Sequence, residues 1–229
     1  MMNGKRRVKR SEYRSPLRAS QAKATRLRVI DAASRLFIER GYGATSIDEI
    51  AEAAGVGRAT VFTSVGGKAL LLRIAYDVAL VGDDEPIPLP QRPWAQPVRL
   101  ATSQTERLDR YADVIALVGG RLAQIYEAFR GAASSDPEVR EQWNEIRADR
   151  LVGARNVVKM VREHGPLRKG LDDEGAADII WILNDPGLYH QLVLQRGWKP
   201  ERFRSWVAGA MRTQLLDANS EAGARRGKR

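Results

Sequence analysis

Residues 29–72 have the sequence VIDAASRLFIERGYGATSIDEIAEAAGVGRATVFTSVGGKALLL. Apolar residues recur in this segment at three- and four-residue spacing, which is the period of an amphipathic helix, and the pattern begins near Ala24. Gly41 interrupts it, as glycine commonly does at the left-handed position after a helix. The pattern therefore predicts a first helix from about Ala24 to Arg40, with further helices after the glycine.

Three shorter helices are expected after Gly41, over residues 46–54, 58–65 and 68–81. The first of these starts with a capping-box pattern, in which Ser46 accepts a hydrogen bond from the Glu49 amide while the Glu49 side chain reaches back to Ser46. Glycine-containing turns separate the helices. A tight glycine turn between two short helices predicts a helix-turn-helix, whose second short helix enters the major groove of DNA.

The helix expected at residues 58–65 has a polar surface that suits DNA. We expect Val61 and Phe62 to point inward and hold it to the core. The residues expected to face outward are Arg58, Ala59, Thr60, Thr63 and Ser64. An arginine can donate two hydrogen bonds to guanine, and a threonine methyl can contact the thymine methyl. An ordinary three-helix bundle with an exposed polar face is the alternative interpretation of this spacing.

The same segment resembles the DNA-binding domain of the TetR family (TetR/AcrR) of bacterial transcription regulators. The matching residues are Ala33, Leu36, Phe37, Gly41, Tyr42, Thr45, Ser46, Ile47, Ile50, Ala51, Ala54, Gly55, Val56, Thr60, Lys68, Leu70 and Leu71. The resemblance implies an all-α fold, in which an N-terminal three-helix helix-turn-helix domain precedes a helical bundle that dimerises and binds a ligand. It also implies a regulator, by default a repressor, that binds a palindromic double-stranded DNA operator as a homodimer and is released by a small-molecule effector. Activation is the alternative mode of regulation.

The resemblance implies DNA contacts at particular positions. Thr45 and Ser46 would cap the second helix and hold a phosphate, and Lys68 would contact the DNA backbone at the start of the fourth helix. The turn and the third helix would contribute Gly57, Arg58, Ala59, Thr60, Thr63 and Ser64. The chain departs from the family at the end of this helix, where it lacks the usual cluster of Tyr, Tyr or His, and Phe. The corresponding residues are Phe62, Ser64 and Val65, and their loss of polar reach predicts weaker binding through this helix.

Positive charge is concentrated at the two ends of the chain. The net charge is +10, of which residues 1–28 contribute +9 and residues 221–229 contribute +3, so that the remaining body is slightly acidic. Basic tails suit a polyanion, because each contact with a phosphate releases a counterion. We expect four of these residues to lie in the minor groove beside the site: Arg6, Arg7, Lys9 and Arg10. The alternatives are tails that only keep the chain soluble, and a nonspecific or architectural DNA-binding protein without effector control.

Composition divides the chain into five parts. The expected boundaries are 1–22 for a flexible basic arm, 23–82 for the helix-turn-helix domain, 83–97 for a proline-rich linker or ordered connection, 98–217 for an all-helical effector-binding and dimerisation domain, and 218–229 for a basic tail. Half of the prolines fall within residues 82–97, and proline at that density prevents a helix. The helices expected beyond it cover about 105–133 with a break or kink at Gly119-Gly120, 137–164, 172–195 with an interruption at 185–187, and 200–217.

The second domain is expected to supply a dimer interface and an effector pocket. Apolar side chains form a stripe along residues 203–211, and the candidate interface residues are Leu192, Phe203, Trp206, Ala210 and Met211. Aromatic and polar side chains of the body helices are candidates for the pocket: Tyr126, Arg130, Trp143, Trp181, Asn184 and Tyr189. For the interface helices a monomeric core is the alternative, and for each pocket residue it is core packing or a solvated face.

The sequence contains none of the motifs that the main classes of enzyme require. There is no cysteine, the histidines lack metal-ligand spacing, and neither a phosphate loop, a dinucleotide fingerprint nor a nucleophile elbow is complete. We therefore expect no catalytic residues, no metal and no cofactor. No apolar run is long enough to span a bilayer, and the basic start lacks the apolar region of a secretory signal. We expect a soluble, cytoplasmic protein without a membrane partner.

Overall fold

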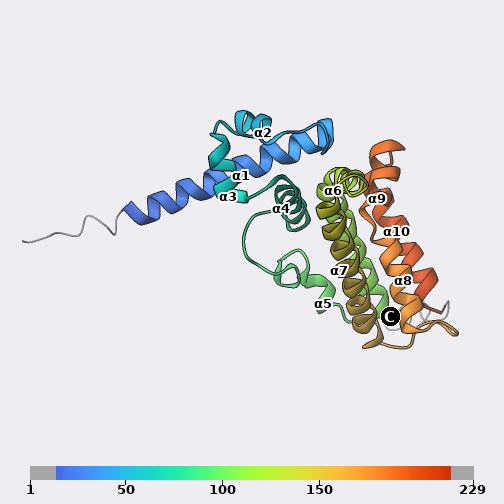
Figure 1. Cartoon of the computed structure of the whole chain (residues 1–229). Helices are drawn as coiled ribbons and strands as arrows, with labels where there is room; N and C mark the ends of the chain where they lie inside the picture. The colour runs from blue at the N-terminus through green and yellow to red at the C-terminus, as the bar shows by residue number, and fades with distance from the viewer. Residues whose placement is uncertain (1–13, 218–229) are drawn as a thin grey trace, which may run out of the picture. The chain divides into compact units, whose positions relative to one another are not determined.

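The computed structural model describes residues 14–217, which contain helices and no strand (Figure 1). The chain divides into two compact units between Ala75 and Tyr76, inside helix α4 (Lys68–Val81). The sequence placed this division at residue 82, after the end of the helix. The difference has a physical cause: the Tyr76 ring packs edge-on against Phe129 with 5.7 Å between centroids, so the last turns of α4 belong with the second unit.

The first unit consists of α1 (Arg14–Arg40), α2 (Ile47–Ala54), α3 (Arg58–Val65) and the start of α4. The bounds of α2, α3 and α4 agree with the expected helices. Their buried side chains form one core: Val29, Ile30, Ala33, Phe37, Ile50, Val61, Leu71 and Leu72. Gly41, at φ +81°, and Gly55, at φ +66°, adopt left-handed conformations directly after α1 and α2. Gly41 therefore ends α1 in the way that the sequence predicted, and Gly55 ends α2 in the same conformation.

Helix α1 is longer than the sequence analysis predicted. Residues 14–22, which were expected to belong to a flexible arm, are its first turns. Residues 18–24 are all exposed, so no apolar stripe marks this part of the helix in the sequence. Helix formation here follows the intrinsic propensity of residues such as alanine, glutamine and lysine, which periodicity does not detect. The minor-groove candidates Arg6, Arg7, Lys9 and Arg10 lie outside the described residues.

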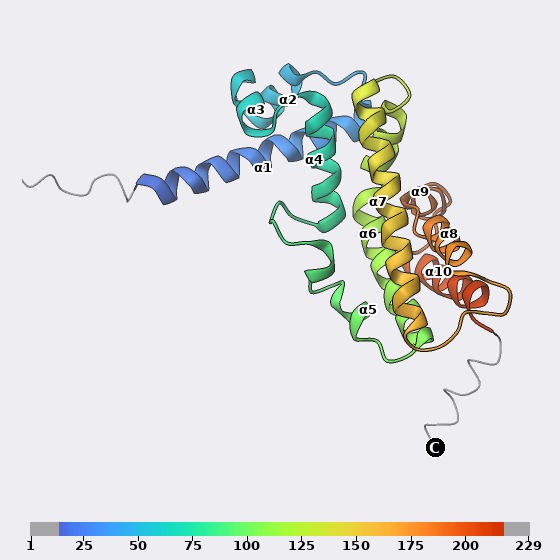
Figure 2. The same cartoon turned by 60° about the horizontal axis from the view of Figure 1, so that its bottom comes forward.

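The second unit is a helical bundle. Its helices are α5 (Gln96–Leu100), α6 (Gln104–Ala132), α7 (Pro137–Arg162), α8 (Asp173–Leu183), α9 (Pro186–Tyr189), a π-helical turn (His190–Gln195) and α10 (Pro200–Leu215). Within this unit α6 packs against α7, α9 and α10, and α8 packs against α7 and α10 (Figure 2). The core between them is apolar and includes Leu108, Ala112, Val157, Val161, Ile180, Phe203, Val207, Met211 and Leu215.

The proline-rich segment is an ordered connection. A short 3₁₀ helix (Leu89–Gln91) lies within it. Arg92 is buried beside this helix and donates hydrogen bonds to the carboxylate of Asp83, at 2.6 Å, and to the carbonyls of Glu85 and Ile87, at 2.9 and 3.0 Å. These bonds hold the segment folded back on itself, because one guanidinium satisfies three acceptors of a chain that cannot form a regular helix.

The expected break at Gly119-Gly120 is absent, and α6 is continuous through both glycines. A Cβ atom on Gly119 would lie 2.7 Å from Cδ2 of Tyr189, a distance that real contacts do not allow. The glycine is therefore needed for the close approach of α9, and the prediction of a break in the helix was wrong. The interruption expected at residues 185–187 is present, since α8 ends at Leu183 and Asp185 caps α9.

The structure corrects two of the dimer-interface candidates. Phe203 and Met211 are fully buried in the core of their own bundle. Leu192 and Ala210 are half-buried, and Trp206 keeps 39% of its surface exposed. A helix whose apolar stripe is this broad buries one edge internally, so a sequence pattern cannot separate the inner edge from the outer one.

No helix within residues 14–217 is long and apolar enough to cross a membrane. The same residues contain no group of three or more acidic or histidine side chains that could hold a metal ion.

Candidate functional site

Helix α3 is anchored through two side chains one turn apart. Val61 and Val65 are buried, whereas Phe62 is 44% exposed. The expectation that Phe62 points inward was therefore wrong. Because consecutive residues of a helix lie about 100° apart, a short helix with a narrow packed face cannot bury both Val61 and Phe62 together with Val65.

Arg58 lies at the first position of α3, directly after the N-cap Gly57. Its guanidinium donates a hydrogen bond to the carboxylate of Asp48 on α2, at 2.6 Å, and both side chains are exposed. The guanidinium carbon also lies 5.5 Å from the ring centroid of Phe62. Asp48 and Phe62 thus hold the arginine at the surface end of the helix, where base recognition was expected.

The other outward candidates of α3 are small. Ala59 and Thr63 are exposed, while Thr60 and Ser64 are half-buried. The hydroxyls of Thr63 and Ser64 donate to backbone carbonyls one turn earlier, Ala59 at 3.1 Å and Thr60 at 2.7 Å. A hydroxyl held in this way must rotate before it can donate to a base, since it has only one proton, but its lone pairs can still accept a hydrogen bond from a base.

Thr45 does not have the role that the resemblance implied. Its side chain is buried, and its hydroxyl lies 3.2 Å from the carbonyl of Leu36 and 2.9 Å from that of Gly41. The hydroxyl thereby ties the start of α2 to the last turn of α1 and to the glycine that follows it. Thr45 therefore fixes the turn between α1 and α2, and it is not available to a phosphate.

Ser46 caps α2 as the sequence predicted. Its hydroxyl accepts a hydrogen bond from the Glu49 amide at 3.2 Å, and its own amide donates to the Glu49 carboxylate at 2.8 Å. This amide bond is the main reason why the pKa of Glu49 is lowered, with the Ser46 hydroxyl and Arg40 acting in the same direction. The cap leaves Ser46 exposed at the helix N-terminus, where the helix dipole favours an anion.

Two further basic residues connect elements within the first unit. Lys68, at the first position of α4, has its ammonium nitrogen 4.1 Å from the ring centroid of Tyr42. Arg26 of α1 donates a hydrogen bond to the backbone carbonyl of Ser64 at 2.7 Å and so ties α1 to the end of α3. The role of Arg26 was not predicted from the sequence, because no local pattern links it to a residue 38 positions away.

The second unit contains a cleft of about 460 Å³ between its helices. The lining residues are Tyr126, Glu127, Arg130, Trp143, Arg147, Trp181, Ile182, Asp185, Gly187, Leu188 and Gln191. Four of the six pocket candidates are among them: Tyr126, Arg130, Trp143 and Trp181. Asn184 and Tyr189 are not, and the structure gives each another role.

Asn184 and Tyr189 are internal contacts. The Asn184 amide donates to the Tyr111 hydroxyl at 2.9 Å, and its carbonyl oxygen accepts from Arg150 at 2.8 Å. Tyr189 is buried edge-on against Phe203 with 5.0 Å between ring centroids. Both side chains make contacts within the bundle and neither lines the cleft, so their assignment to the pocket was wrong.

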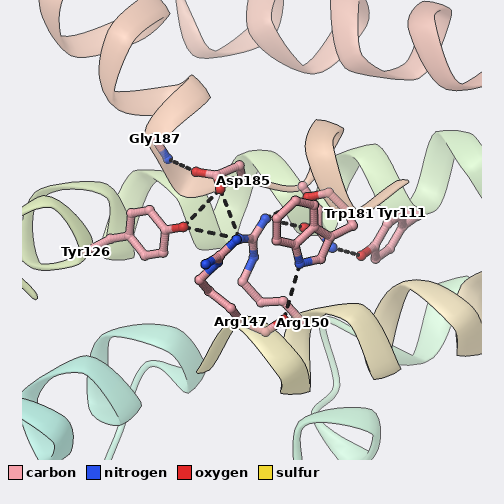
Figure 3. Close-up of polar contacts among 8 residues, drawn as sticks. Tyr111, Tyr126, Arg147, Arg150, Trp181, Asp185 and Gly187 are labelled. Carbon is pink, nitrogen blue, oxygen red and sulfur yellow. Dashed lines mark hydrogen bonds and ion pairs between the residues drawn. The ribbon is translucent and has the colours of Figure 1, made fainter. Parts of the chain in front are cut away.

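Arg150 of α7 is the centre of the network beside the cleft (Figure 3). One terminal nitrogen donates to the Tyr126 hydroxyl at 3.1 Å and to the Asp185 carboxylate at 2.9 Å. The other donates to the carbonyl of Trp181 at 2.7 Å and to Asn184. The arginine thereby joins α6, α7 and the junction of α8 and α9. Burial is the main cause of the raised pKa of Tyr126, whose hydroxyl also donates to Asp185 at 2.9 Å.

No local sequence pattern indicates this network. Its members are spread over about 60 positions, and Arg150 lies on a charged stretch of α7 that has the pattern of a solvated face. Asp185 could have been recognised as an N-cap, because it precedes a proline, which favours the first turn of a helix.

The sequence of the helix-turn-helix unit matches the model of a known protein family. The sequence model described as "Bacterial regulatory proteins, tetR family" matches residues 29–73, which contain α2, α3 and the buried part of α1. Residues 29–73 are therefore a DNA-binding domain of the TetR family. Members of this family bind DNA and regulate transcription, and they are not enzymes.

Two relatives are similar in sequence to this chain. It is 23% identical over 154 residues, 67% of the chain and 72% of the relative, to the uncharacterized HTH-type transcriptional regulator YdeS of Bacillus subtilis. It is 42% identical over 55 residues, 24% of the chain and 41% of the relative, to the uncharacterized HTH-type transcriptional regulator TtgW of Pseudomonas putida.

Solved structures share the fold of most of this chain. A putative transcriptional regulator from Saccharomonospora viridis in complex with choline superimposes with a TM-score of 0.63 at 19% identity, covering 84% of this chain and 97% of the other. The SmeT–triclosan complex gives 0.61 at 21%, covering 85% and 93%. NalD, the secondary repressor of the MexAB-OprM multidrug efflux pump in Pseudomonas aeruginosa, gives 0.60 at 20%, covering 85% and 96%. These similarities establish the N-terminal helix-turn-helix and the C-terminal helical domain.

Proposed function

We propose that this TetR-family regulator is a repressor that binds a palindromic operator as a homodimer and is released by a small-molecule effector. The observation that carries the proposal is the placement of α3: Val61 and Val65 fix it to α1 and α2, and its first turn is exposed. A rigid helix with an exposed start is the geometry of a recognition helix, whose N-terminal residues contact base edges.

The DNA contacts proposed from this geometry fall into two groups. Arg58, with Ala59 and Thr63 beside it, is placed to contact base edges in the major groove. Phosphates are the proposed partners of Lys68 and of the exposed N-terminus of α2 at Ser46. Gly57, Thr60 and Ser64 complete the surface.

A homodimer is proposed because one short helix cannot select an operator alone. Two copies related by a twofold axis place their α3 helices about 34 Å apart, one helical turn of DNA. Trp206 and Ala210 of α10 remain the candidate contacts, together with Leu192 in the π-helical turn. Trp206 lies next to Gly209 and Ala210 in space along one side of α10, and such small residues allow a second helix to approach closely.

The cleft is the proposed effector site. Its volume lies in the usual range for small-molecule pockets, and Tyr126, Trp143 and Trp181 contribute aromatic surface to it. Two of the similar structures are complexes with small molecules, choline and triclosan, and a third is named as a repressor. Release follows if the effector binds one conformation more tightly than another and that conformation no longer fits the operator.

The proposal is tested by the preference for specific DNA. Fluorescence anisotropy with the protein's own upstream sequence and with a scrambled duplex, at about 150 mM salt, should show a preference of roughly a thousandfold or more. Equal affinity for both duplexes would support the second candidate, an architectural DNA-binding protein, and would overturn the repressor.

A further inference from the structure

We infer that the effector is a small aromatic anion, held by Arg147 and flanked by the aromatic walls of the cleft. The regulatory role of this ligand rests on the proposed function, whereas its binding depends only on the second unit. It is carried by the pairing of the charged side chains that line the cleft.

Two basic groups, one lining the cleft and one beside it, are already ion-paired. Arg130 donates to the Glu127 carboxylate at 3.0 and 2.5 Å, and this interaction raises the pKa of Arg130. Arg150 is paired with Asp185 at 2.9 Å. Each carboxylate of the cleft therefore has its own guanidinium, and neither needs a charge from a ligand.

Arg147 has no such partner. Within residues 14–217 its guanidinium makes no ion pair or side-chain hydrogen bond, and its carbon lies 5.5 Å from the ring centroid of Trp181 (Figure 3). The Trp181 indole donates a hydrogen bond to the Arg147 backbone carbonyl at 3.2 Å, and this bond holds the ring beside the Arg147 backbone. A guanidinium that lies against an aromatic ring and keeps its hydrogen-bond donors is suited to a carboxylate, which it can bind through two parallel bonds.

The field in the cleft favours an anion. The charged lining residues are Glu127, Arg130, Arg147 and Asp185. Because Arg150, beside the cleft, is paired with Asp185 and Arg130 with Glu127, the positive charge of Arg147 is left in excess. A cationic ligand would have to compete for a carboxylate that is already paired. Asp185 cannot be released for this purpose without cost, because it also caps α9 through the Gly187 amide at 2.7 Å and accepts from the Tyr126 hydroxyl.

The walls of the cleft favour an aromatic group. Trp143 packs against Tyr126 with 4.8 Å between ring centroids, and Trp181 contacts the guanidiniums of both Arg147 and Arg150. Ile182 and Leu188 add aliphatic surface. Rings prefer offset or edge contacts with other rings, so a planar ligand can pack here while its charge meets Arg147.

Three probes of equal size and different charge test the inference: naphthoate, naphthamide and naphthylmethylammonium. Isothermal titration calorimetry of the full chain should show naphthoate binding at least about tenfold more tightly than the neutral amide, with the cation weakest, because a charge-assisted pair is about twice as strong as a neutral hydrogen bond. Arg147→Gln should reduce the naphthoate affinity about tenfold, to that of the amide, and leave the amide affinity unchanged. Arg140→Gln, on the same helix outside the cleft, is the matched control and should change neither affinity.

The outcomes separate the inference from the proposed function. Tightest binding of the cation, unchanged naphthoate binding in Arg147→Gln, or no binding of any probe would overturn the inference. Operator binding is measured in the same variants and should match that of the unmodified protein, which also shows that they are folded. If naphthoate binds through Arg147 without weakening operator binding, the anion site stands and effector release fails. If no specific operator binding exists, the repressor fails while calorimetry still tests the site.

Discussion

Arg58 occupies the position from which α3 would contact bases, and Asp48 already holds its guanidinium at 2.6 Å. An exposed ion pair of this kind adds at most about 1 kcal/mol to stability. Replacing the arginine should therefore leave the fold intact and remove a DNA contact. We expect Arg58→Ala to weaken operator binding by about 1–3 kcal/mol and to relax the base preference at one position of each half-site.

Arg155 offers a matched control for this change, since it is an exposed arginine paired with Glu174 in the other unit. Arg155→Ala should leave operator affinity unchanged in the same anisotropy titration. If the two variants lose affinity equally, Arg58 acts through overall charge, and its role in base recognition is wrong.

Thr45 provides the complementary case, in which a residue first assigned to DNA acts on stability. Thr45→Val keeps the shape of the side chain but leaves the carbonyls of Leu36 and Gly41 without their hydroxyl donor. The expected cost is about 1–3 kcal/mol in the free energy of unfolding, measured by urea denaturation. Operator affinity below the melting transition should be nearly unchanged. A large loss of operator affinity in a Thr45→Val variant of normal stability would instead support a contact between Thr45 and a DNA phosphate.

At the scale of elements, the packing of α9 on α6 depends on a glycine. A methyl group at Gly119 would collide with the Tyr189 ring, which is held between α6 and Phe203. We expect Gly119→Ala to destabilise the protein by about 1–3 kcal/mol, because an overpacked core must shift its side chains. Gly131, in the same helix, has open space around it. Gly131→Ala should instead stabilise by about 0.5–1 kcal/mol, and equal effects of the two changes in urea denaturation would contradict this account.

The elements show which parts of a structure a sequence can predict. The bounds of α2, α3 and α4 follow from glycines and a capping box, which act within a few residues. The start of α1 was missed because a helix without a packed face has no apolar period. The Arg150 network was not predicted because its partners meet only when three helices pack. No local sequence pattern predicts a contact between residues 35 positions apart.

At the scale of the whole molecule, the proposed dimer can be tested without disturbing the fold of one copy. Gly209 of α10 is half-buried, and no heavy atom lies within 4 Å of a Cβ built on it. Gly209→Arg should therefore be accepted by the bundle but should prevent close approach of a second α10. Light scattering after gel filtration should show monomers, and operator binding should fall because two linked half-sites become independent.

The control for this variant is Gly153→Arg, at an exposed and equally open position of α7. It should remain dimeric and keep its operator affinity. A dimer that persists in Gly209→Arg, with unchanged circular dichroism, would exclude this side of α10 from the interface.

The basic N-terminal end contributes to the long-range electrostatic attraction between the whole protein and DNA. Residues 1–13 carry five Lys/Arg and one acid, and α1 begins directly after them, so their deletion leaves the first helix complete. Each cation that contacts a phosphate contributes about 0.9 to the slope of log K against log salt. We expect the deletion to weaken operator binding and to flatten this slope by about one for each such contact. Deleting residues 221–229 removes a similar net charge from the other end and should leave the slope unchanged. If both deletions flatten it equally, the tails act only through net charge and neither lies in a groove.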